Sequence, residues 1–264
     1  MTERESILDK IVAEKRAAVA KAQQAVPLEQ LKARMRGPKE TRPFAEALQQ
    51  GEPLGLVAEI KRQSPSRGVL RERFDPIAIA QDYQAAGAHA LSVLTDEPSF
   101  GGRLEYIREV KQFTELPVLR KDFILEPYQV YESAVAEADA ILLIVAILEQ
   151  DDLFELHHLA RSLGLEVLVE VHSEAELTQA LGIHATLIGI NHRDLHTFTM
   201  DVSLSERLRP HIPQSVTVVA ESGLTAPADI QRMRRADVDA VLIGEAFMVQ
   251  ADIQRAVKML MGWP

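Results

Sequence analysis

The sequence contains no cysteine among its 264 residues. A chain without thiols has no disulfide framework, no thiolate zinc site and no iron–sulfur cluster, and no cysteine can act as its nucleophile or base. Basic residues are outnumbered, because 29 Lys and Arg face 39 Asp and Glu and give a net charge of −10. Most of such a surface repels a polyanion, so we expect no nucleic-acid partner. A local cluster of cations and backbone N–H groups can still hold a small anion.

Long hydrophobic runs are also missing. The longest purely apolar run has nine residues, 140–148, whereas a membrane-spanning helix needs about 20. The first ten residues are rich in charge and lack the apolar core of a secretion signal. We therefore expect a cytoplasmic protein with no membrane partner.

Short apolar runs alternate with helical stretches from about residue 54 onward, which is the pattern of βα units. Eight runs have this character, and they cover residues 54–60, 89–95, 117–123, 139–145, 165–171, 185–191, 215–221 and 238–244. Several are apolar at consecutive positions, as strands covered on both faces are. The sequence therefore predicts an α/β fold, a single (β/α)8 TIM barrel, rather than an open doubly wound sheet of about five or six parallel strands.

The first 50 residues lie outside the eight units. Apolar residues recur at helical spacing over 7–19, and similar patterns predict two shorter helices over 28–35 and 44–48. Because about fifty residues would make a poor core on their own, we expect residues 1–50 to form a helical extension packed on the barrel. The whole chain, 1–264, is then one domain.

Polar residues that end the strands are the candidates for chemistry, because barrel enzymes carry their active sites at the C-terminal ends of the strands. These residues are Glu59, Lys61, Lys121, Glu170, Asn191, Glu221, Ser222 and Gly244. Side chains alternate along a strand, so Glu59 and Lys61 point to the same face. The same alternation sends Arg120 and Asp122 away from the mouth, where we expect them to form an ion pair.

Four of these residues together predict acid–base catalysis. A single lysine or glutamate at a strand end is more often a structural ion pair, but Glu59, Lys61, Lys121 and Glu170 would share one mouth. Burial raises the pKa of a carboxyl group and nearby ammonium groups lower it, so a group balanced between the two can exchange protons near neutral pH.

Glycine-containing loops after the seventh and eighth strands predict a phosphate site. Gly223 and Gly244 let backbone N–H groups approach a ligand, and a short helix beginning at Glu245 would add the positive end of its dipole. The polar loop over 61–68, which includes Ser64, carries three cations and two hydroxyl groups. It is either a solvated turn or a mobile lid that closes over an anion.

Aromatic residues are scarce, at 5% of the chain, yet two lie near the predicted mouth. Phe100 and Phe123 are each more often core residues, but together they would line an apolar pocket for a flat ring. Asn191 is the only asparagine in the sequence. Its neutral donor and acceptor suit the orientation of a substrate hydroxyl group.

Histidines carry less information. His157 and His158 fall in a predicted helix, and His192 and His196 fall in the loop after the sixth strand. No pair of them has a carboxylate at the spacing of a metal site, so we interpret them as solvated or capping residues and expect no metal.

Six segments of the sequence match one enzyme family at the expected strand ends and in the expected order. They are EIKRQSPSRG (59–68), LRKDFI (119–124), LVEVH (168–172), IGINHRDL (188–195), AESGL (220–224) and LIGEAFM (242–248). Through them the chain resembles indole-3-glycerol phosphate synthase over essentially its whole length. The resemblance implies closure of an indole ring from 1-(2-carboxyphenylamino)-1-deoxyribulose 5-phosphate, with loss of carbon dioxide and water, in tryptophan biosynthesis. It implies no metal or organic cofactor.

The resemblance also implies roles for individual residues. Lys121 matches the general acid, Lys61 the lysine that meets the ring carboxylate, and Glu59 and Glu170 the carboxylates that handle protons. The implied catalytic set is Lys121, Glu170, Glu59, Lys61, Asn191 and Ser222. The resemblance also implies that Arg193 and Glu221 orient the substrate and that Ser64, Gly223 and Gly244 fall at its phosphate. With Phe100, Phe123 and Glu245, these residues make up the predicted substrate-binding set. One departure is His192, where the family more often has a second asparagine.

Three other functions are alternatives for such a barrel. Phosphoribosylanthranilate isomerase is a phosphate-binding barrel that uses a cysteine base, and this chain has no cysteine. A lysine Schiff-base aldolase would be revealed by borohydride trapping on Lys121 or Lys61. A catalytically silent barrel that serves as a scaffold fits poorly with four acid–base residues. The expected partner is a phosphorylated small molecule, bound by a monomer or weak homo-oligomer.

Overall fold

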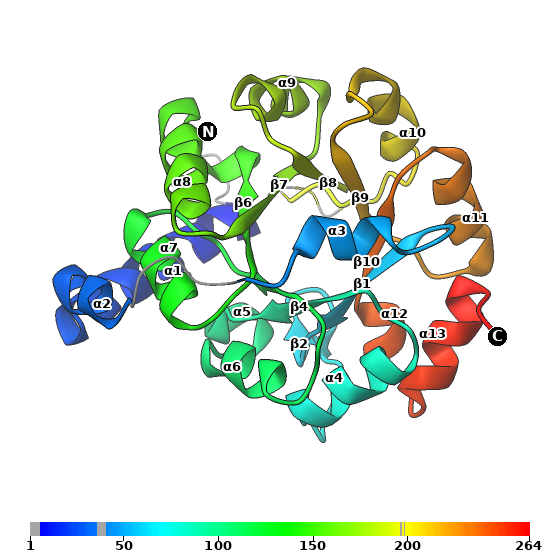
Figure 1. Cartoon of the computed structure of the whole chain (residues 1–264), viewed down its shortest axis with the longest axis horizontal. Helices are drawn as coiled ribbons and strands as arrows, with labels where there is room; N and C mark the ends of the chain where they lie inside the picture. Colours follow the sequence, from blue (N-terminus) through cyan, green and yellow to red (C-terminus); the bar gives the residue numbers. More distant parts are fainter. Residues whose placement is uncertain (1–5, 36–40, 196, 198) are drawn as a thin grey trace.

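Eight parallel strands form a closed barrel in the computed structural model, which describes residues 6–35, 41–195, 197 and 199–264 (Figure 1). The strands are β1 (Gly55–Ile60), β4 (Ala90–Leu94), β5 (Val118–Lys121), β6 (Ala140–Ile144), β7 (Glu166–Val171), β8 (Leu187–Asn191), β9 (Thr217–Glu221) and β10 (Ala240–Ile243). Pairing of Gly55 in β1 with Ala240 in β10 closes the ring. The predicted TIM barrel and each of its eight strands are confirmed.

Strand side chains fall into an inner and an outer apolar layer. All five positions of β6 are buried, which explains why the barrel strands appear as continuous apolar runs in the sequence. Val57, Leu119 and Leu168 belong to the inner cluster, whereas Leu56 and Ala58 pack outward among the helices. The inner rows continue by steps of two toward the C-terminal mouth, so they aim the residues that follow them into that mouth.

Helices follow the strands and cover the outside of the barrel. The longer ones are α4 (Pro76–Ala85), α6 (Glu105–Lys111), α7 (Pro127–Val135), α8 (Gln150–Ser162), α9 (Glu174–Gly182), α10 (Leu204–Leu208), α11 (Pro227–Arg235) and α13 (Ile253–Met261). The shorter ones are α5 (Glu97–Phe100), η1 (Val145–Ile147), η2 (Arg209–His211) and α12 (Glu245–Met248). Asp75 caps α4 by accepting hydrogen bonds from two backbone N–H groups, and Pro76 takes the first helical position.

The polar loop over 61–68 contains a small hairpin that the sequence did not predict. Its strands are β2 (Gln63–Ser64) and β3 (Gly68–Val69), which pair antiparallel. The turn between them is closed by a hydrogen bond from the Arg67 N–H to the Ser64 carbonyl, 3.3 Å long. Gly68 then takes φ +67°, a conformation that glycine adopts without steric cost.

Three N-terminal helices contact both ends of the barrel. They are α1 (Ile7–Ala25), α2 (Leu28–Arg34) and α3 (Phe44–Gln49), and α3 crosses the barrel opening that faces the viewer in Figure 1. Phe44 and Leu48 of α3 are fully buried in the inner cluster and close the N-terminal end of the barrel. Leu8 and Ile11 of α1 reach the opposite, C-terminal end. In the part of the chain described, we find no helix with the length and apolar character needed to cross a membrane.

Candidate active site

A cavity of about 320 Å³ opens at the C-terminal ends of the barrel strands. The residues expected from the sequence all line it, namely Glu59, Lys61, Ser64, Phe100, Lys121, Phe123, Glu170, Asn191, Arg193, Glu221, Ser222, Gly223, Gly244 and Glu245. The fold thus brings one complete set of acid–base, amide and aromatic groups into a single pocket. Their individual roles remain predictions.

Lys121 lies between two carboxylates at the bottom of this cavity. Its Nζ atom is 2.9 Å from Glu170 Oε2 and 2.5 Å from Glu221 Oε2. These residues end β5, β7 and β9, and Glu59 ends β1, so all four come from alternate strands. In a TIM barrel, side chains from alternate strands fill the same layer. The layer nearest the C-terminal mouth is therefore charged, whereas the layers below it are apolar.

Burial and ion pairing push the pKa values of this cluster apart. Burial would lower the pKa of Lys121, but the neighbouring carboxylates of Glu170, Glu221 and Glu59 outweigh it and raise that pKa. Burial would raise the pKa of Glu170, but the Lys121 ammonium and His172 hold it well below its usual range. For Glu221, burial raises the pKa, and repulsion from Glu170 adds to this despite the attraction of Lys121. The cluster combines a fixed ammonium with one ionised carboxylate and one that takes up a proton readily.

Gly189 makes room for the Glu221 carboxyl group. A Cβ atom at this position of β8 would collide with Glu221 Oε1. That oxygen is buried and has no hydrogen-bond partner among the residues that the structure describes. Sequence reasoning missed Gly189, although a glycine inside a strand is itself a sign of close approach.

A second lysine–glutamate pair lies across the cavity. Lys61 Nζ is 2.5 Å from Glu59 Oε1, and both side chains are largely buried. This contact follows from their two-residue separation at the end of β1, as the sequence predicts. Gly244 packs beside the pair, because a Cβ atom there would lie 2.6 Å from Glu59 Oε1.

Backbone N–H groups gather at the rim formed by the loops after β9 and β10. Ser222 and Gly223 are consecutive left-handed residues, with φ +66° and +73°, and α12 begins directly after Gly244. A helix start and a turn of this kind are places where anions bind. The side chain of Arg67 reaches across from the β2–β3 hairpin to Glu245, with Nε and Oε1 2.8 Å apart.

His192 supports this rim from behind, and the interpretation of it as a solvated or capping residue is wrong. Its side chain is buried, Nδ1 lies 2.9 Å from the Ser222 carbonyl oxygen, and Nε2 lies 2.7 Å from Ser205 Oγ. Because a carbonyl oxygen only accepts, Nδ1 donates and the neutral ring accepts from Ser205 through Nε2. Burial lowers the pKa of His192, which agrees with a neutral ring.

The other histidines named from the sequence lie away from the cavity. His157 and His158 both lie in α8, as predicted, and the ring of His158 stacks on Phe154 at the surface. His196 lies outside the described residues.

An apolar pocket occupies one side of the cavity. The rings of Phe100 and Phe123 are 6.3 Å apart and inclined by 31°. Leu142 of β6 and the α1 residues Leu8 and Ile11 also line this cavity. The sequence indicated that Leu8 and Ile11 face a packed surface. Nothing in their local pattern indicated that this surface was the mouth, because it is built by residues that follow roughly 50 positions or more along the chain.

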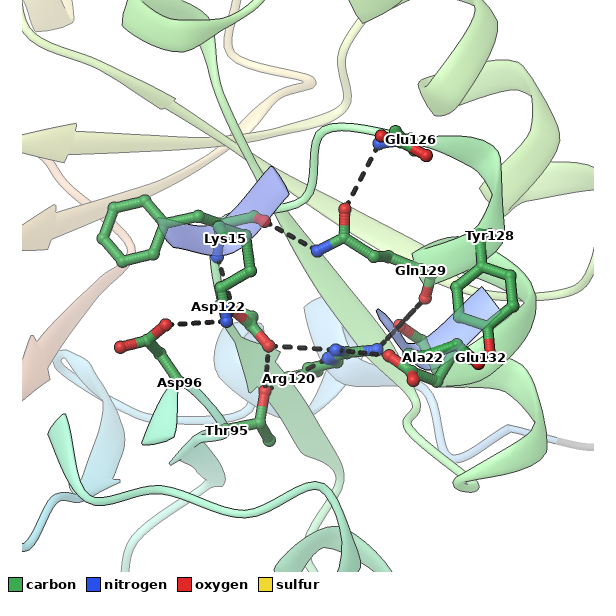
Figure 2. A network of polar contacts seen from close by, with 12 residues as sticks. Lys15, Ala22, Thr95, Asp96, Arg120, Asp122, Glu126, Tyr128, Gln129 and Glu132 are labelled. Carbon is green, nitrogen blue, oxygen red and sulfur yellow. Dashed lines mark hydrogen bonds and ion pairs between the residues drawn. The ribbon is translucent and has the colours of Figure 1, made fainter. Parts of the chain in front are cut away.

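A buried ionic network joins Lys15 of α1 to Asp96 and Asp122, which follow β4 and β5 (Figure 2). Lys15 Nζ lies 2.6 Å from Asp96 Oδ1 and 2.7 Å from Asp122 Oδ1. Asp122 also forms the ion pair with Arg120 predicted from the sequence, at 2.9 Å. Asp96 caps α5, which ends at Phe100, and Asp122 accepts a hydrogen bond from the backbone N–H of the next residue, Phe123.

The sequence comparisons with known proteins agree on one family. Residues 8–260 match the family described as Indole-3-glycerol phosphate synthase. A protein of that name from Dehalococcoides mccartyi is 49% identical over 214 residues, which cover 80% of this chain and 83% of that protein. Another from Rhodopirellula baltica is 42% identical over 256 residues, covering 97% and 99%. Among solved structures, a 3-hexulose-6-phosphate synthase superposes with a TM-score of 0.62 at 16% identity, covering 79% of this chain and 99% of that one, which shows the shared fold alone.

Proposed function

The chain belongs to the indole-3-glycerol phosphate synthase family, and we propose that Lys121, with Glu170 and Glu59, carries the proton transfers of its reaction. The protein is a carboxy-lyase of tryptophan biosynthesis that closes the indole ring of 1-(2-carboxyphenylamino)-1-deoxyribulose 5-phosphate. The observation that carries the assignment of residues is the buried ammonium of Lys121, held by two carboxylates of unlike pKa.

Ring closure needs a proton donor at the substrate carbonyl. The aromatic carbon that bears the carboxylate forms a bond to the carbonyl carbon, and the carbonyl oxygen takes a proton and becomes a hydroxyl group. Lys121 is the donor in this proposal, because its ammonium is fixed at the bottom of the cavity. The carboxylate then leaves as carbon dioxide, and its bonding electrons return to the ring. Lys61 offers the opposite charge that binds this carboxylate before it leaves.

Dehydration needs an acid and a base at neighbouring atoms. The hydroxyl group leaves as water once it is protonated, and the adjacent carbon loses a proton to form the double bond of the indole. Lys121 again suits the acid once it has regained a proton, which Glu221 can return because its raised pKa favours the protonated form and its Oε2 atom lies beside Lys121 Nζ. Glu170 is ionised and Glu59 lies on the opposite wall, so these two carboxylates are the bases that remain.

Substrate orientation follows from the three regions of the cavity. We assign the phosphate to the rim of Ser64, Gly223 and Gly244, where backbone N–H groups and the start of α12 gather. The aromatic ring fits between the apolar pocket of Phe100 and Phe123 and the ammonium of Lys61. Asn191, Arg193 and Ser222 then face the sugar chain between them. Because residues of α1 line the same cavity, residues 1–50 act as part of a single domain in this proposal.

Replacing Gly244 by valine is expected to weaken substrate binding more than it weakens folding. The new side chain would obstruct the phosphate rim, and loss of a hydrogen bond to a charged group costs about 1.5–3 kcal/mol, so KM should rise at least about tenfold. Its Cβ atom would also press on Glu59, so kcat should fall. Steady-state kinetics of Gly182→Val, where an added Cβ atom would meet only the Gln150 side chain at an ordinary contact distance of 3.9 Å, separate these effects from the general cost of valine. An unchanged KM would refute the phosphate assignment.

Incubation of the purified protein with 1-(2-carboxyphenylamino)-1-deoxyribulose 5-phosphate tests the function directly. Indole fluorescence should rise while carbon dioxide is released in equal amount. Borohydride added during turnover should leave Lys121 and Lys61 unmodified by mass spectrometry. Absence of the indole product would contradict the proposal, and a trapped adduct on either lysine would favour Schiff-base chemistry instead.

A further inference from the structure

His172 follows β7 and lies behind Glu170, outside the cavity lining. Its Nε2 atom is 3.3 Å from Glu170 Oε1, and its Nδ1 atom is 3.1 Å from Glu176 Oε2, a residue of α9. The backbone N–H of His172 donates to the same Glu176 oxygen at 2.8 Å, and Ser173 caps the helix beside it. The ring is therefore fixed between an active-site carboxylate and a carboxylate of the outer helices.

Both nitrogens of this ring face carboxylate oxygens. A neutral imidazole presents a lone pair on one nitrogen, which would repel the carboxylate that it faces, whereas an imidazolium donates from both. Burial lowers the pKa of His172, but its contacts with the Glu170 and Glu176 carboxylates outweigh it and raise that pKa to about 10. Geometry and charge agree on a positively charged ring at neutral pH.

Glu170 consequently lies between two cations. Lys121 of β5 binds its Oε2 atom at 2.9 Å, and His172 faces its Oε1 atom. The other charged groups around this cluster are Glu221 of β9 and Glu59 of β1, which both attract Lys121. Without a second cation, Glu170 and Glu221 would compete for one ammonium and share a proton between them.

We propose that His172 is a positioning residue that stays positively charged, keeps Glu170 ionised and anchors one of its oxygens, so that the other oxygen exchanges protons beside Lys121. This inference rests on the role of Glu170 given under the proposed function. It adds a residue that never touches substrate and acts only through a carboxylate. Glu176 contacts the other nitrogen of the ring and stabilises its positive charge.

The pH dependence of kcat/KM tests this role with His172→Gln, which keeps hydrogen-bonding groups and removes the charge. Loss of the cation raises the pKa of Glu170, so the acid limb of the profile should move upward by about one pH unit. Glu176→Gln should move it in the same direction by less, because Glu170 still pairs with the ring. His158→Gln removes an exposed histidine of α8 and should leave the profile unchanged.

A folded His172→Gln enzyme whose acid limb coincides with that of the unsubstituted protein would overturn the proposal. If that variant fails to fold, ¹⁵N NMR spectra of the unsubstituted protein report the protonation of the His172 ring directly. The spectra stay simple because the protein has only eight histidines. Two protonated ring nitrogens at His172 at pH 7 support the proposal, and a neutral tautomer refutes it. Full turnover in Glu170→Gln would instead refute the proton-transfer role given to Glu170 under the proposed function. The charge on His172, measured by ¹⁵N spectra, does not depend on that result.

Discussion

Lys121→Ala is expected to lower kcat by about 10²–10⁴-fold, the usual contribution of a positioned proton donor. The ammonium ends in a buried site between Glu170 and Glu221, so water cannot replace it as an acid of matched position. Folding should survive the change. Burial and the repulsion between the two carboxylates raise the pKa of Glu221, which can take up a proton, and Glu170 keeps its contact with His172.

A matched control is Lys111→Ala. Lys111 also forms a buried ion pair, with its Nζ atom 2.6 Å from Asp139 Oδ1, but this pair lies outside the cavity. Its loss should reduce the free energy of unfolding and leave kcat unchanged. Circular dichroism and urea unfolding establish folding in both variants, and indole fluorescence gives turnover. Near-normal turnover in folded Lys121→Ala would reject Lys121 as the general acid.

Much of the barrel could be predicted because each βα unit has a local pattern, a short apolar run followed by a helical stretch. The strands are largely buried on both faces, so several of them appear as apolar residues at consecutive positions, and their C-terminal ends lie at the mouth. Alternation by two then indicates that Glu59 and Lys61 share a face. The polar ends of the first, third, fifth and seventh strands meet in one layer for the same reason. Position along a strand, together with strand order, was sufficient to gather the four acid–base residues.

Other parts of the site depend on contacts between distant segments. Leu8 and Ile11 have the spacing of any amphipathic helix, and which surface they cover is decided by packing alone. His192 follows a strand as a loop residue would, yet α10 covers it and Ser205 binds its ring. Glu176, which is needed to charge His172, lies in the following helix, where an acidic residue is ordinarily a solvated one.

Removal of one buried charge from α1 is expected to destabilise the protein most. Lys15→Met should reduce the free energy of unfolding by about 3–5 kcal/mol at pH 7, because it leaves the buried Asp96 carboxylate without this cation and Asp122 with Arg120 alone. Lys15 pairs with Asp96 and Asp122, whose side chains are nearly inaccessible (Figure 2). KM should rise as well, since the same carboxylates hold the backbone beside Phe100 and Phe123. Lys21→Met, at an exposed position of the same helix, is the control.

The loss of unfolding free energy in Lys15→Met should depend on pH, in a direction that follows from the pKa shift of Asp122. Burial would raise the pKa of Asp122, but Arg120 and Lys15 lower it, so its ionised form stabilises the fold above the ordinary aspartate pKa of about 3.9. That contribution disappears as the pH falls through the lower pKa of the folded state. The difference between Lys15→Met and the unsubstituted protein should therefore be full near pH 7 and shrink below about pH 4. Urea unfolding at both pH values measures it, and equal midpoints at pH 7 would show that this buried network does not fasten α1 to the barrel.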